Sequence, residues 1–119
     1  MLPYGLSQDR DLIRQGTQET HHDRVCMGVK NTDGTKDLIV LHGEVTFPSG
    51  SSIIISDVYL QDPLNSFNAV GGADISNTST TFEISDIDLA PNASYELVIV
   101  FSASPGDAGV RVELEGLFD

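Results

Sequence analysis

The sequence has no tryptophan and a single cysteine among its 119 residues. A lone cysteine cannot form an internal disulfide, and we interpret Cys26 as a small apolar residue on a strand. Aromatic residues are also few, with three tyrosines and five phenylalanines. A chain of this length can still bury about two-thirds of its unfolded surface, so one domain can fold without a disulfide or a metal.

Basic residues are scarce as well, since six lysines and arginines stand against 18 acids, for a net charge of −12. Nucleic acids and anionic membranes are recognised by clustered basic side chains, so neither is expected as a partner. No apolar run reaches the length that crosses a bilayer, which argues against membrane insertion. The residues after Met1 lack the pattern of an export signal. We therefore expect a chain that is used inside a cell, or one whose leader was removed.

Aspartate supplies 12 of the 18 acids, and lysine occurs only at Lys30 and Lys36. A hydrated acidic coat with little lysine suits concentrated salt, where self-repulsion is screened. We therefore expect a halophilic source. The alternative is an ordinary acidic domain that its charge keeps soluble.

Residues 1–24 are mostly polar and form the first of two expected regions, an extended N-terminal arm. Ser7–Gln15 has the signals of a short helix, because Ser7 can cap it and Gly16 can end it. Such a helix would have only about two turns, which is marginal in water. We expect the arm to bind a partner through its few apolar residues, which are Leu2, Tyr4, Leu6, Leu12 and Ile13.

From Arg24 onward, apolar residues recur at every second position, as in half-buried strands. Turn residues such as Asp33-Gly34 separate these segments. Strands are expected over residues 25–30, 38–47, 52–60, 67–70, 80–84, 95–103 and 110–117. Short strands at this spacing predict an all-β domain over residues 25–119, an Ig-like or jelly-roll-like antiparallel β-sandwich of about seven strands. The residues expected to face its core include Ile39, Leu41, Val45, Phe47, Phe82, Ile84, Val110, Val112 and Leu114.

Two stretches resemble a known kind of module. Val25–Thr35, "VCMGVKNTDGT", is similar to the opening of bacterial and archaeal surface Ig-like repeats. Residues 87–115, "IDLAPNASYELVIVFSASPGDAGVRVELE", resemble the closing half of the same repeats and of CARDB-type adhesion modules, with Asn92 where glycine is usual. The resemblance implies a binding or spacer module without catalysis.

Acidic side chains are the candidates for metal binding. Asp86 and Asp88 flank Ile87, so on a strand both carboxylates would share one face about 7 Å apart. Asp57 lies beside a predicted turn, and oxygen clusters of this kind can bind Ca²⁺. The sequence contains no complete calcium-loop motif. We expect no metal site, and Asp57, Asp86 and Asp88 are the candidates if Ca²⁺ does bind.

The motifs of catalysis are missing from the sequence. Paired carboxylates that cleave sugars need a sugar-holding cleft, and aromatic residues to line one are few. His21 and His22 are adjacent and would point in opposite directions on an extended arm, so they would not converge on a metal. There is no Gly-x-Ser-x-Gly elbow and no phosphate loop. We expect no catalytic residue, no cofactor and no enzymatic activity.

These observations favour a non-enzymatic structural or interaction protein. The expected role is a small virion component, such as a capsid decoration or minor head or tail protein of a tailed virus, located in the virion and docked through its N-terminal arm. Its partners would be shell proteins or further copies of the chain in a homo-oligomer. The alternatives are a surface adhesion or spacer Ig-like module of a halophilic or marine microbe, at the cell surface or secreted, and a carbohydrate- or Ca-binding β-sandwich.

Overall fold

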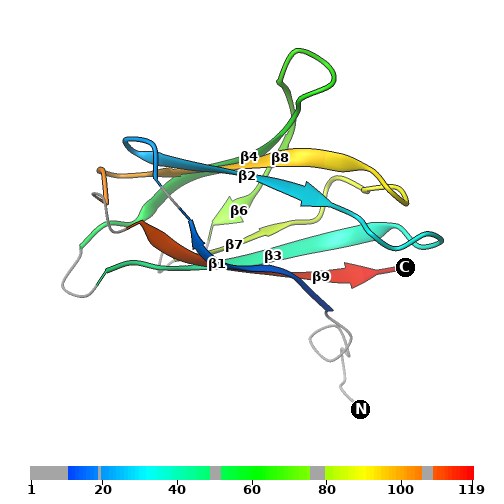
Figure 1. Cartoon of the computed structure of the whole chain (residues 1–119), viewed down its shortest axis with the longest axis horizontal. Coiled ribbons are helices and arrows are strands. Elements are labelled where there is room, and N and C mark those ends of the chain that lie inside the picture. Colours follow the sequence, from blue (N-terminus) through cyan, green and yellow to red (C-terminus); the bar gives the residue numbers. More distant parts are fainter. Residues whose placement is uncertain (1–10, 19, 49–51, 76–79, 106–108) are drawn as a thin grey trace.

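The computed structural model of the chain describes residues 11–18, 20–48, 52–75, 80–105 and 109–119. These residues form nine β-strands and no helix, which confirms the all-β prediction (Figure 1). All seven expected strands occur, and β1 and β6 are additional. The strands are β1 (Asp11–Gln18), β2 (Arg24–Lys30), β3 (Leu38–Thr46), β4 (Ile55–Asp62), β5 (Asn68–Gly72), β6 (Asp74–Ile75), β7 (Thr81–Ile84), β8 (Ser94–Phe101) and β9 (Val110–Phe118).

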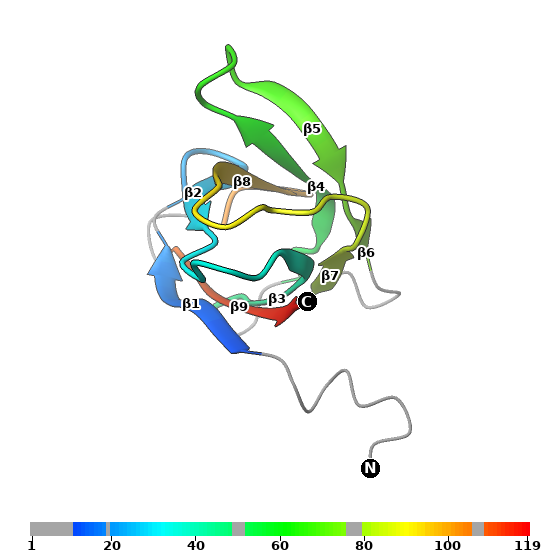
Figure 2. The same cartoon turned by 90° about the vertical axis from the view of Figure 1, so that its right-hand side faces the viewer.

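The strands form two antiparallel sheets that pack face to face (Figure 2). One sheet has the order β1-β9-β3-β7-β6 and the other β2-β8-β4-β5. The pairing is nested along the chain, because β1 pairs with β9, β2 with β8, β3 with β7 and β4 with β5. This is the strand order of a jelly roll, in which one long antiparallel ribbon is rolled into a sandwich. An immunoglobulin sandwich divides its strands differently, so the jelly-roll-like alternative of the predicted fold is the one observed.

The core lies between the two sheets and is filled by alternate residues of facing strands. Leu97 and Ile99 of the central strand β8 are fully buried. Phe47, just beyond β3, packs edge-on against Phe101, with ring centroids 5.2 Å apart. The predicted inward positions of β7 and β9 are confirmed as buried, and these are Phe82, Ile84, Val110, Val112 and Leu114.

Strand β3 departs from the predicted alternation at one point. Leu41 and Val45 are buried as expected. A register shift between Leu38 and Val40 places Leu38 in the core and leaves Ile39 half-buried. Such a bulge puts an extra residue into one strand, so the side chains before it change faces.

The polar N-terminal region contributes a strand to the sandwich. Residues 11–18 form β1, which pairs with β9 from Asp11 opposite Gly116 to Gln18 opposite Val110. The helix signalled over Ser7–Gln15 is therefore wrong for residues 11–15, and residues 7–10 lie outside the described part of the chain. The paired strands thus begin well before the boundary expected near Arg24. Backbone pairing with β9 needs no apolar side chains, so an edge strand with one solvent-facing side can be largely polar.

One hydrogen bond links the two sheets at one side of the sandwich, and another holds the chain where it crosses between them at the other side. Arg14 of β1 donates from Nη1 to the Gly28 carbonyl of β2, at 2.7 Å. On the opposite side, the chain crosses between the sheets at Ala73, whose N–H donates to the Val58 carbonyl at 3.1 Å. Within the described ranges, the chain forms no helix that could span a membrane.

Candidate functional site

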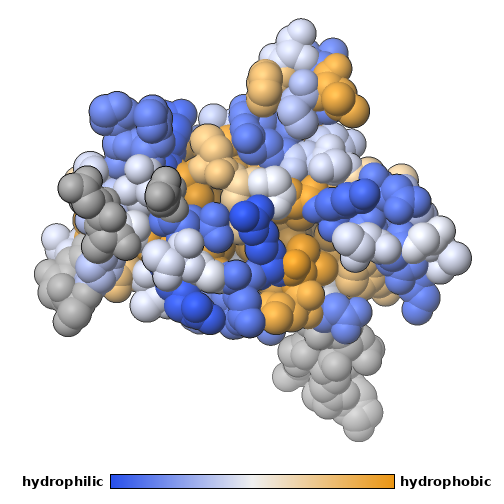
Figure 3. All heavy atoms as spheres, in the orientation of Figure 1, coloured by the Kyte–Doolittle hydropathy of each residue, from blue (hydrophilic) through white to orange (hydrophobic). Residues whose placement is uncertain are grey.

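A hairpin between β4 and β5 projects from the body of the sandwich, and the sequence reading did not single it out. Residues 63–70 are all exposed. Leu64 is 93% exposed, Phe67 55% and Val70 39%. Figure 3 shows apolar atoms on this projection, above a body whose visible face mixes hydrophilic and apolar surface. One sequence feature could have pointed to this hairpin, since residues 63–73 contain no charged side chain in a strongly acidic chain.

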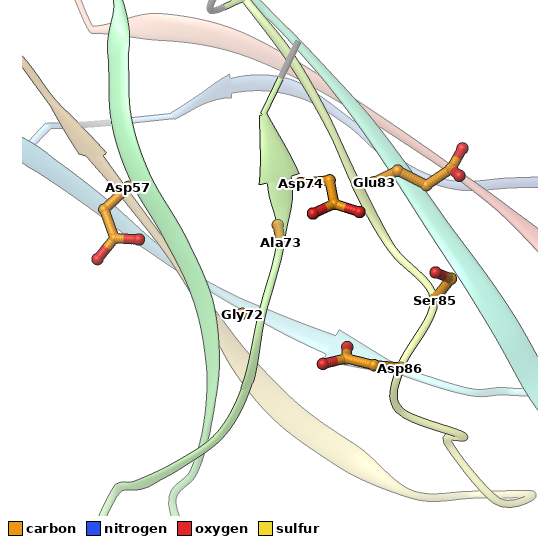
Figure 4. Close-up of a pocket in the computed structure, with 7 residues that line it drawn as sticks. All are labelled: Asp57, Gly72, Ala73, Asp74, Glu83, Ser85 and Asp86. Carbon is orange, nitrogen blue, oxygen red and sulfur yellow. The ribbon is translucent and has the colours of Figure 1, made fainter.

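A cleft of about 410 Å³ opens where the chain crosses from one sheet to the other. Its lining contains four carboxylates and no basic side chain (Figure 4). This concentration of negative charge attracts cations and repels anionic molecules. The lining residues are Asp57, Gly72, Ala73, Asp74, Glu83, Ser85 and Asp86.

Four different segments bring these carboxylates to the cleft. Asp57 lies on β4, and its Oδ1 accepts a hydrogen bond from the Val58 N–H at 2.9 Å. Asp74 begins β6 and lies directly opposite Glu83 of β7. Asp86 lies in the loop that follows β7. Like charges on directly opposed residues repel, so the pair of Asp74 and Glu83 destabilises this part of the sheet.

Two of the three predicted calcium candidates meet at this cleft. Asp57 and Asp86 line it, whereas Asp88 does not. The expected strand face shared by Asp86 and Asp88 is wrong, because β7 ends at Ile84 and both residues follow it. Figure 4 shows the carboxylates spread along the cleft rather than turned toward one point. Among the described residues, no three His, Cys, Asp or Glu side chains are grouped so that they could hold a metal ion.

The outer surface of the five-stranded sheet carries a second acidic region, which we call the acidic face. Glu44 of β3 lies directly opposite Glu113 of β9. His42, two residues earlier on β3, lies between Glu83 and Glu115 on the neighbouring strands. Its Nδ1 is 3.7 Å from Oε2 of Glu83. A surface of this kind suits contact with a basic protein surface, because charged patches bind patches of opposite sign.

His21, His22 and Cys26 do not line the cleft. His21 and His22 are in the turn between β1 and β2, where their rings meet edge to face at 4.8 Å. Cys26 is exposed on β2. Desolvation raises the pKa of the Cys26 thiol, the Glu96 carboxylate raises it further, and Arg24 partly offsets both. The thiolate is the reactive form, so Cys26 is a poor nucleophile at neutral pH.

The predicted partner-binding residues fall into three groups. Leu2, Tyr4 and Leu6 lie outside the described residues. Leu12 is 53% exposed and lies opposite Glu115, on the outer side of the sheet. Ile13 faces the other way and packs against the core. Of the described members, Leu12 is therefore the one that a partner can reach.

No protein-family model matches the chain, and no curated protein matches its sequence. Its role therefore has to be argued from the fold and the surfaces.

Proposed function

We propose that this chain is a non-enzymatic structural protein of a virus particle, such as a capsid decoration or minor head or tail protein of a tailed virus. The observation that carries the proposal is the nested strand order, because the jelly roll is a recurring fold of viral capsid domains. A fold can host several functions, so the surfaces must also suit assembly.

The start of the described chain supports docking through the N-terminal region. Asp11 begins β1 beside Gly116, so the chain enters the sandwich at the edge of the five-stranded sheet. Leu12 is an exposed apolar side chain at this point, and Ile13 anchors the strand to the core. A partner that covers Leu12 would bury apolar surface without disturbing the core, which is how the arm would attach the domain to a shell.

Density-gradient fractionation of lysed producer cells tests this role with three forms of the tagged full-length chain. The wild type is expected at particle density. Leu12→Asp is expected to be incorporated about tenfold less, since even 1.4 kcal/mol of lost binding has that effect. Thr17→Asp adds the same charge to an exposed position on the same strand and serves as the matched control. A wild type that stays with free soluble protein would contradict the proposal.

A second candidate is a calcium- or carbohydrate-binding β-sandwich, and the acidic cleft favours it. Oxygen ligands are those that Ca²⁺ prefers, and jelly rolls include lectin domains. Titration calorimetry with Ca²⁺ and with a glycan panel tests this candidate. If it is correct, Asp57→Asn combined with Asp86→Asn abolishes the heat of binding, whereas Asp88→Asn leaves it intact because Asp88 does not line the cleft. Absence of heat from the wild type in both titrations would remove this candidate.

A further inference from the structure

The tip of the β4–β5 hairpin, residues 63–70, presents apolar side chains that are exposed among the described residues. Leu64, Phe67 and Val70 are three of the five exposed large apolar side chains among the described residues. Apolar groups gathered on a projection, as opposed to scattered singly, mark a contact surface. The hairpin therefore has the side chains of an interface, and no other part of the described chain buries them.

Backbone contacts fix the conformation of this tip. The Asp62 carbonyl accepts hydrogen bonds from the N–H groups of Asn65 at 3.1 Å and Phe67 at 2.9 Å. The Asp62 carboxylate also accepts one from the Leu64 N–H at 3.0 Å. Ser66 and Phe67 both have a positive φ, at 57° and 56°. Two successive non-glycine residues in this region strain the backbone, and such strain is typical of turns that serve a function. This hydrogen-bonded turn holds the Phe67 side chain in an exposed position.

Charge indicates which partner suits the tip. The chain carries −12 overall, whereas residues 63–73 contain no charged side chain. Two copies repel each other across their acidic surfaces, and this uncharged, projecting hairpin is a place where they can approach. A partner selected by charge would instead meet the acidic face or the acidic cleft.

The backbone of the hairpin offers the same partner a second kind of contact. Strand β5 ends the four-stranded sheet, so no strand of the described chain pairs with its outer edge. Natural edge strands are commonly protected by lysine, proline or an inward-pointing charge, and β5 reads Asn-Ala-Val-Gly-Gly. A two-fold axis beside β5 would pair this edge with the same edge of another copy, in the antiparallel sense.

We infer that the β4–β5 hairpin joins two copies of this chain. The edges of β5 pair at Asn68–Val70, and Leu64 and Phe67 of one hairpin pack against those of the other. This inference does not depend on the particle role, because a dimer would form in the purified protein. It also fixes the sign of the salt dependence. Salt screens the repulsion between the two acidic bodies and leaves the apolar contact intact, so the dimer becomes tighter as salt is added.

Sedimentation velocity of the purified full-length chain tests the inference. Between about 0.1 M and about 1 M NaCl the screening length falls from about 10 Å to about 3 Å, and the dimer is expected to tighten at least tenfold. Phe67→Ser and Leu64→Ser are each expected to weaken it by about tenfold or more, as for central interface residues. Ile54→Ser removes a comparably exposed apolar side chain, 43% exposed, from outside the hairpin, and should sediment like the wild type.

Hydrogen exchange on the same samples locates the contact. The β5 amides that point away from β4 should exchange more slowly under conditions where the dimer forms, and the Phe67→Ser variant should lose this protection. The Asn68 N–H already donates to the Asn65 carbonyl, so it serves as an internal reference. The substituted side chains are exposed, so the variants should keep the wild-type unfolding temperature, which the same preparations can report. A chain that stays monomeric at both salt concentrations would overturn the inference. A dimer that loosens with salt, or one that Phe67→Ser leaves unchanged, would also overturn it.

Discussion

Asn31 is the one buried polar side chain among the described residues, and all its hydrogen-bonding groups are used. Its Nδ2 donates to the carbonyls of Lys36 at 2.8 Å and Leu89 at 2.9 Å. Its Oδ1 accepts from the Asp33 N–H at 3.0 Å. One side chain thus ties the loop after β2 to the segment before β8. A buried polar group is tolerated in a core only when it is satisfied in this way.

Asn31→Ala should therefore lower the free energy of unfolding by roughly 2–3 kcal/mol, since it removes three side-chain hydrogen bonds at a buried site. The Leu89 carbonyl keeps the bond that it accepts from the Leu38 N–H at 2.9 Å. Asn68→Ala, at an exposed position of β5, is the control and should change stability by about 0.5 kcal/mol at most. Urea unfolding of the three proteins measures both effects. Equal stability of the two variants would contradict the role assigned to Asn31.

Gly43 and Gly28 form a matched pair of strand glycines. A Cβ at Gly43 would overlap the ring of Phe82, which lies directly opposite on β7. A Cβ at Gly28 would meet open space. We expect Gly43→Ala to destabilise the fold by about 1–3 kcal/mol through overpacking, and Gly28→Ala to stabilise it by about 0.5 kcal/mol because the unfolded chain becomes less free. Thermal unfolding measures both effects. If the unfolding temperatures of the two variants changed in the same direction, the packing described for Gly43 would be wrong.

Asp33 gives the fold a defined dependence on pH. Its Oδ1 accepts hydrogen bonds from the N–H groups of Thr35 at 2.8 Å and Lys36 at 2.9 Å. These bonds favour the ionised form and hold the pKa of Asp33 below its ordinary value. The folded state therefore binds this proton more weakly than the unfolded state. The stabilisation is complete above the ordinary carboxyl pKa of about 3.9 and is lost as the pH falls through the lower folded pKa.

Asp33→Asn should accordingly be less stable than the wild type near neutral pH, because a neutral amide is a weaker acceptor than a carboxylate. The difference should shrink in acid, where the wild-type carboxyl is protonated as well. Denaturant unfolding of both proteins across this range measures it. A difference that does not change with pH would show that the hydrogen bonds do not depend on the ionised carboxylate.

At the scale of elements, β1 shows what the sequence pattern conceals. Its sequence, DLIRQGTQ, has only two apolar side chains, Leu12 and Ile13, and they are adjacent. Adjacent residues of a strand face opposite sides, so only Ile13 reaches the core, and a bulge between Leu12 and Arg14 interrupts the register. The sequence of β1 therefore shows neither the alternating pattern nor the apolar content by which a strand is usually recognised. β1 becomes a strand because it pairs with β9, whose residues lie about 100 positions away along the chain.

Leu12 and Ile13 should therefore respond differently to truncation. Ile13→Ala should lower the free energy of unfolding by about 1–2 kcal/mol, near the lower end for buried isoleucine because Ile13 is only partly buried. Leu12→Ala should leave it within about 0.5 kcal/mol. Chemical denaturation of the two variants measures the contrast. If both behaved like the wild type, β1 would be a detached arm and its place in the sheet would be wrong.

The other elements show why most of the sandwich was predictable. Strands β2 and β7 alternate cleanly, as does β9 from Val110 to Gly116, so their buried faces follow from the sequence. Pro91-Asn92 also indicates a turn in the sequence. Asn92 has a φ of 67°, in the region that glycine and asparagine tolerate best, so it replaces the usual glycine without loss of the turn. The bulge in β3 and the two-residue strand β6 could not be foreseen, because both depend on which strand lies alongside.

At the scale of the whole molecule, the nested pairing could not be derived from the sequence. Alternation tells which side of a strand is buried but not which strand is its neighbour, so Ig-like and jelly-roll-like sandwiches share one pattern. The acidic cleft was equally hidden. Asp57 and Asp86 were both candidates, and the crossing at Ala73 brings Asp74 of β6 to the same cleft. The cleft and the acidic face arise from topology, whereas the net charge of −12 is a property of composition alone.

We propose that this jelly roll is a built-in part of a virus particle. The most direct measurement is the number of copies of the chain in virus particles purified from the cells that produce them, by quantitative mass spectrometry against the major shell protein. We expect a fixed ratio of this chain to the shell protein that does not change on repeated purification. Loss of the chain from the particles as purification proceeds, or its absence from them, would rule out a structural role in the particle.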